Sequence, residues 1–76
     1  MKMMIRGCKE AGSYDGPSVK GKPWVEHASS RKELEIVVER RERECDIIEE
    51  IVTEGKAPKY VIDYCRRYGV KLTENI

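Results

Sequence analysis

Phenylalanine is absent from this sequence, and tryptophan and histidine each occur once, at Trp24 and His27. The chain has 76 residues, of which 39% are hydrophobic and 38% are charged. A chain this short buries only about 60% of the surface that its unfolded form exposes, so a core with few aromatic residues is marginal. We therefore expect one small domain over residues 1–76 that gains stability from a partner subunit.

Paired cysteines are also lacking, because Cys8, Cys45 and Cys65 stand singly. An odd number of widely spaced cysteines argues against the disulfide framework of a small secreted protein. Structural zinc sites almost always contain a close cysteine pair, so a site built from these three cysteines and His27 is disfavoured. No motif places His27 beside a nucleophile, which argues against an enzyme. The sequence predicts no metal, no cofactor and no catalytic residue.

Long apolar runs are missing as well. The first ten residues have a charge or a glycine every few positions, unlike a signal peptide. No segment approaches the length of apolar sequence that crosses a bilayer. These absences predict a cytoplasmic protein with no membrane contact.

Residues 30–54 are predicted to form one long helix. Ser30 and Glu33 have the spacing of a capping box, which begins a helix. Neither glycine nor proline follows until Gly55, a good residue for a helix end. Apolar residues recur at helical spacing within the segment. They are Leu34, Val37, Val38, Cys45, Ile48, Ile51 and Val52.

A second helix is predicted over residues 58–68. Pro58 suits a helix start and Gly69 suits a helix end. The connection between the two helices is only three residues long, which favours an antiparallel helical hairpin over residues 30–69. Residues 70–76 are expected to be a frayed tail.

Residues 1–29 are expected to form an N-terminal arm. Asp15, Gly16 and Pro17 indicate a turn, and the segments on either side could pair as a short β-hairpin within residues 1–28. We expect Trp24 to anchor this arm across the helices. The predicted fold class is mainly α, with a small α+β fold as the alternative if the arm forms strands.

Charge is distributed in blocks. Residues 30–54 have a net charge of −4, whereas residues 55–71 have a net charge of +4. One interpretation is that the basic helix folds back onto the acidic one, so that its arginines pair with Glu49, Glu50 and Glu54. The other is that the basic helix faces a partner, because tyrosine and arginine dominate interface energetics. The predicted partner-binding residues are Lys59, Tyr60, Tyr64, Arg66 and Arg67.

The same helix offers a nucleic-acid alternative, since arginines bind phosphates and tyrosines stack on bases. A helix-turn-helix motif is disfavoured, because the first helix would bring acidic side chains toward phosphates. The long helix also carries more apolar surface than the shorter one can cover, which favours a homodimer. The predicted dimer interface consists of Leu34, Val37, Val38, Arg41 and Glu44.

Small size and mixed charge resemble compact interaction proteins of phages and mobile elements. The sequence therefore predicts a protein-binding module, dimeric, that acts as an inhibitor or adaptor by occupying a partner surface. Binding of nucleic acid through the basic helix over residues 56–71 is the alternative.

Overall fold

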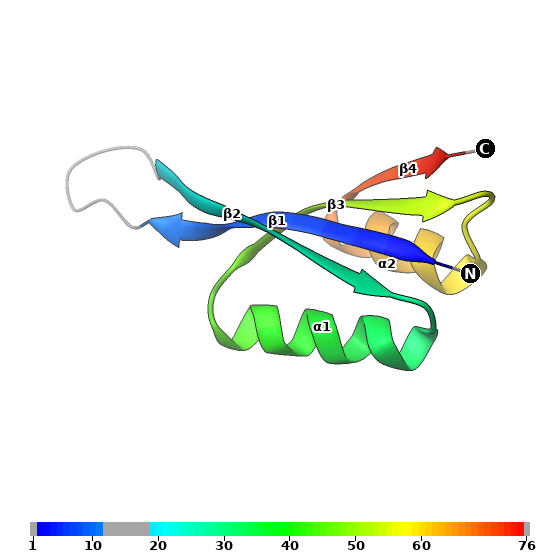
Figure 1. The fold of residues 1–76 in the computed structure, drawn as a ribbon, viewed down its shortest axis with the longest axis horizontal. Helices are drawn as coiled ribbons and strands as arrows, with labels where there is room; N and C mark the ends of the chain where they lie inside the picture. The colour runs from blue at the N-terminus through cyan, green and yellow to red at the C-terminus, as the bar shows by residue number, and fades with distance from the viewer. Residues whose placement is uncertain (1, 12–18, 76) are drawn as a thin grey trace.

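The chain folds into a four-stranded sheet that carries two helices (Figure 1). The computed structural model describes residues 2–11 and 19–75. The prediction of a mainly α helical hairpin is wrong, because the last third of the predicted long helix and most of the predicted tail are strands. The elements are β1 (Met3–Ala11), β2 (Val19–Ala28), α1 (Arg31–Arg43), β3 (Ile47–Glu54), α2 (Lys59–Tyr68) and β4 (Lys71–Asn75).

Helix α1 begins where the sequence predicted. The Ser30 hydroxyl caps it by accepting a hydrogen bond from the Glu33 amide at 3.2 Å. The Glu33 carboxylate accepts from the amide of Ser29 at 2.6 Å and from its hydroxyl at 2.8 Å, one residue before the expected position. The backbone hydrogen bond from Ser29 lowers the pKa of Glu33. The helix start is therefore encoded locally.

The end of α1 comes eleven residues before the predicted one. Cys45 adopts the left-handed conformation, with φ at 58°. The Cys45 amide donates to the Glu42 carbonyl at 3.1 Å, and the Asp46 amide donates to the Arg41 carbonyl at 2.9 Å. This pair of bonds is a Schellman closure, which usually takes glycine at the left-handed position. Here a cysteine takes that position, so the amino-acid sequence did not indicate that the helix ends there.

Replacing Cys45 with glycine is expected to stabilise the protein. A side chain at positive φ is strained and glycine is not, so the free energy of unfolding should rise by about 0.5–1 kcal/mol. Urea denaturation followed by circular dichroism measures the change. Cys45→Ser is the control, because it removes the thiol and keeps the strain. Equal stability of the glycine and serine variants would contradict this account.

The residues after the turn form β3 because they pair with β1. Five of the eight residues of β3 are β-branched, which suits a strand. Strand β1 lies at the centre of the sheet and runs antiparallel to both β2 and β3. The sheet order is β2-β1-β3-β4, and β4 runs parallel to β3. The segment predicted as a frayed tail is therefore an edge strand.

This topology places both helices on one face of the sheet. Strands β2, β3 and β4 point the same way, and the connections through α1 and α2 both move in the same direction along the sheet. Connections of this kind are right-handed, so they leave the two helices on the same face. The helices also run parallel to one another, since β3 carries the chain back between them (Figure 1). The predicted antiparallel packing of two consecutive helices is wrong for this reason.

The core lies between the sheet and the helices. Alternate residues of β1 and β3 face the helices, among them Ile5 and Ile51, which are fully buried. Helix α1 contributes Leu34 and Val37, and α2 contributes Val61. The apolar stripe of α1 is thus covered by the chain's own sheet.

Trp24 anchors β2 to the C-terminal end of α1. Its ring stands over Gly7 of β1, and the Arg41 guanidinium lies 4.1 Å from the ring centre. Arg41 donates to Glu26 at 3.0 Å and to Asp46 at 2.8 Å. We call Trp24, Glu26, Arg41 and Asp46 the Arg41 cluster. It joins strand, helix and turn.

Candidate functional site

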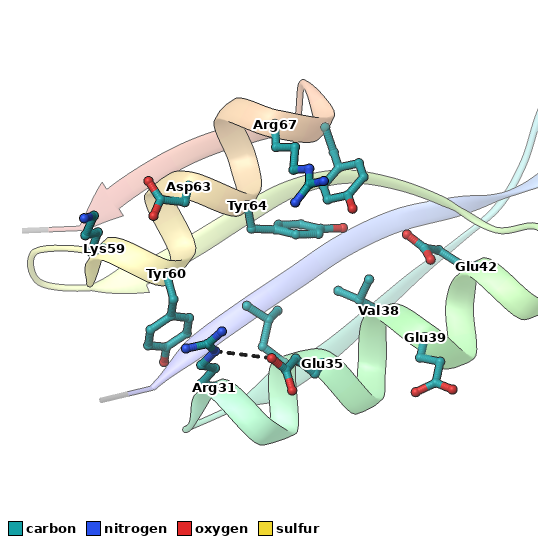
Figure 2. A pocket seen from close by; sticks show the side chains of 12 residues that line it. Arg31, Glu35, Val38, Glu39, Glu42, Lys59, Tyr60, Asp63, Tyr64 and Arg67 are labelled. Carbon is teal, nitrogen blue, oxygen red and sulfur yellow. Dashed lines mark hydrogen bonds and ion pairs between the residues drawn. The ribbon is translucent and has the colours of Figure 1, made fainter.

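A groove runs between α1 and α2 on the helical face of the sheet (Figure 2). Its volume is about 700 Å³, within the range of ligand-binding clefts. Each helix contributes one wall of six residues. Those on α1 are Arg31, Leu34, Glu35, Val38, Glu39 and Glu42, and those on α2 are Lys59, Tyr60, Asp63, Tyr64, Arg67 and Tyr68.

The wall formed by α2 follows from its helical period. Val61 and Cys65 point into the core, so residues one position before each of them lie on the groove side. These residues are Tyr60 and Tyr64. Tyr68 continues the row, with its ring centre 5.0 Å from that of Tyr64 and the two planes at 45°. Three tyrosines therefore line one wall.

The groove has an apolar floor and an open top. Leu34 is buried at its base, and Val38, Tyr60 and Tyr64 are partly buried against the core. Tyr68 has 57% of its surface exposed. A large aromatic side chain left open beside an apolar floor is typical of a contact surface.

Charges on the α1 wall are mostly paired within the helix. Arg31 contacts Glu35 at 3.2 Å, and Arg43 contacts Glu39 at 3.2 Å. Glu42 takes part in no ion pair among the described residues, and Figure 2 shows it across from Tyr64. Glu42 is therefore the carboxylate of this wall that no described cation pairs with.

The α2 wall is basic at both ends. Lys59 lies toward one end of the groove and Arg67 toward the other, beside Tyr64 (Figure 2). The Arg67 guanidinium stands 5.7 Å from the centre of the Tyr68 ring. A cation of the chain itself therefore lies over one of the three tyrosines.

Tyr64 is partly buried, and its neighbours include the Glu42 carboxylate. Burial raises its pKa to about 12, with further contributions from the negative charge of Glu42 and from Cys65 and Tyr68. The hydroxyl is protonated over the whole physiological range. Tyr64 can thus donate a hydrogen bond within the groove while its ring supplies apolar surface.

Four of the five predicted partner-binding residues meet in this groove. They are Lys59, Tyr60, Tyr64 and Arg67. Arg66 is exposed but does not line the groove, since neighbouring residues on a helix point about 100° apart. The sequence missed the opposite wall, because the placement of α1 depends on where β3 begins.

The predicted dimer interface is divided among different environments. Leu34 and Val37 are buried in the chain's own core, so a second copy is not needed to cover them. Val38 lines the groove, and Arg41 is engaged in the Arg41 cluster. Glu44 is exposed at the end of α1. Most of the apolar surface of α1 that favoured a homodimer is covered by the chain's own sheet.

The residues of the disfavoured zinc site lie in separate places. Cys8 and Cys65 are buried and Cys45 is exposed. His27 pairs with Met4 across β1 and β2 and lies on the sheet face opposite the helices. Within residues 2–11 and 19–75, no three histidine, cysteine or acidic side chains are grouped as metal ligands would be.

No known protein family, curated protein or solved structure matches this chain. Neither described helix has the length and apolar character needed to cross a membrane.

Proposed function

We propose that this protein is a protein-binding module and that the groove between α1 and α2 receives its partner. The observation that supports this most directly is the row of three tyrosines beside an apolar floor. Tyrosine buries a large area at a low cost in side-chain entropy, and binding energy concentrates at such residues. Because the groove stands on helices packed against a sheet, it is preformed and needs little ordering on binding.

The module would act by occupancy, as an inhibitor or an adaptor. A segment of the partner that fills the groove would cover Tyr68 and the edges of Tyr60 and Tyr64. Covering exposed aromatic surface supplies the hydrophobic part of the binding energy.

Nucleic acid is the second candidate and the groove disfavours it. Glu35, Glu39 and Glu42 line the wall that faces the tyrosines. A phosphate backbone in the groove would pass these carboxylates, which costs electrostatic energy. Lys59 and Arg67 are the only cations that α2 contributes to the groove lining, and they stand across from these carboxylates.

Site-specific photo-crosslinking tests the proposed function. A benzoylphenylalanine at position 68 is expected to form adducts with a partner protein in a nuclease-treated lysate of the native host. The same probe at position 25 is the control, because Val25 is 53% exposed and its strand neighbour Trp24 faces α1, which places position 25 on the opposite sheet face.

Charge reversal at two adjacent positions sharpens this test. Arg67→Glu should lower the adduct yield at position 68 severalfold, whereas Arg66→Glu should leave it unchanged, since only Arg67 lines the groove. Equal yields from positions 68 and 25 would contradict the proposal. Adducts to nucleic acid at position 68 without nuclease treatment would favour the second candidate.

A further inference from the structure

We infer that the segment received by the groove is an amphipathic helix whose basic flank lies against α1, with an arginine or lysine docked on Glu42. This inference depends on the proposed function and specifies the chemistry of the partner. It follows from the backbone of the walls, from their charges and from the environment of Glu42.

The walls favour a helical occupant. Both walls are helices, whose interior backbone groups are already hydrogen-bonded along the helix. An extended segment would find few main-chain partners there, and backbone groups removed from water without a partner are costly. A helix satisfies its own backbone and can present a stripe of apolar residues to Leu34, Val38 and Tyr64.

The two walls differ in charge. The groove side of α1 has three carboxylates, at Glu35, Glu39 and Glu42, against the single cation of Arg31. The groove side of α2 has two cations, at Lys59 and Arg67, against the single carboxylate of Asp63. Charge complementarity therefore places the basic flank of the occupant toward α1.

Glu42 is the point where a partner cation gains most. Glu35 and Glu39 are engaged with arginines of their own helix, and Glu42 is in no ion pair among the described residues. Tyr64 stands opposite Glu42 with its hydroxyl protonated (Figure 2). Arg67 already lies over the Tyr68 ring, whereas the structure gives no cation over the Tyr64 ring among the described residues, so Tyr64 is the aromatic face open to a partner cation. A partner arginine would contact the Glu42 carboxylate and the Tyr64 ring together.

Two designed peptides test the inference. Both are helical, with the same stripe of leucines, and differ only in having lysine or glutamate along one flank. Binding to the full-length, isotope-labelled protein is followed by the shifts of amide resonances in two-dimensional NMR spectra. The lysine peptide is expected to bind about tenfold more tightly, with shifts concentrated on groove residues.

A matched pair of variants identifies the docking carboxylate. Glu42→Lys is expected to abolish the preference for the lysine peptide, whereas Glu44→Lys, at the C-cap of the same helix and outside the groove, should retain it. Equal affinity of the two peptides, or binding of neither, overturns the inference. In either of those cases an adduct from position 68 but not from position 25 leaves the proposed function standing, so the two failures are distinguishable.

Discussion

Gly7→Ala is expected to cost about 3 kcal/mol or more of stability. A Cβ atom at position 7 would lie 1.9 Å from the Ile47 carbonyl oxygen and 2.5 Å from Cζ2 of Trp24. The first neighbour is backbone and the second belongs to the Arg41 cluster, so neither can move without displacing β3 or α1. Strand β1 also changes register against β3 between Arg6 and Gly7.

Chemical denaturation followed by circular dichroism measures this loss. A domain of this length has a total stability on the order of 4–11 kcal/mol, so the variant should retain about 1–8 kcal/mol and unfold at a lower denaturant concentration. Gly55→Ala is the control, because Gly55 has φ at 81° but no atom within 4 Å of an added Cβ. It should cost only about 1 kcal/mol, from backbone strain. Similar losses at both positions would show that the contact with Trp24 and Ile47 is not the cause.

Arg41→Met is expected to cost about 3 kcal/mol, because it leaves a buried carboxylate without its partner. The Asp46 side chain is 2% exposed and pairs with Arg41 at 2.8 Å. Arg41 also binds Glu26 and covers Trp24, so its loss affects strand, helix and turn together. Arg40→Met is the control: Arg40 also contacts Glu26, but it is 51% exposed and should contribute less than about 1 kcal/mol.

A double variant separates charge from packing in this cluster. If the unpaired carboxylate causes the loss, Asp46→Asn should recover part of it in the Arg41→Met background. No recovery would mean that the packing of the arginine on Trp24 dominates. Equilibrium denaturation of the four proteins completes the cycle.

The same cluster predicts a loss of stability in acid. Burial raises the pKa of Glu26, but the hydrogen bonds and charges of Arg40 and Arg41 outweigh burial, so its pKa lies below the ordinary value. A carboxyl group with a lowered pKa stabilises the fold at neutral pH, and this contribution disappears as the pH falls through that pKa. Glu26→Gln should therefore lose less stability than the natural protein between about pH 5 and pH 3. If the free energy of unfolding fell equally with pH in the two proteins, the assignment to Glu26 would be contradicted.

Short-range signals in the sequence located some elements well. Pro58 and Gly69 bracket α2, and Ser30 caps α1, because each of these residues acts within one helical turn. The predicted alternative of an N-terminal β-hairpin also corresponds to β1 and β2, which pair antiparallel. For the two helices the deciding interaction spans few residues.

The segment Ile47–Glu54 shows why the remainder was mispredicted. Ile48, Ile51 and Val52 have a spacing that fits the buried stripe of a helix. In the fold, Ile51 is fully buried on the helix-facing side of β3, and the register shift beside Gly7 places Ile48 opposite that glycine. The end of α1 at Cys45 could not be predicted from the sequence, because cysteine seldom adopts positive φ. The strand is selected by pairing with β1, whose partner residues lie 39 to 50 positions earlier in the sequence.

Only one wall of the candidate groove could be predicted from the sequence, for the same reason. The tyrosines and basic residues of α2 share one helix, so their common face follows from the sequence alone. The opposite wall depends on β3, which carries the chain back across the sheet and leaves α1 and α2 parallel on one face. Local sequence thus determined the caps, the second helix and its tyrosine face. Tertiary structure decided the strand, the second wall and the groove, because strand pairing and helix placement depend on residues far apart in the chain.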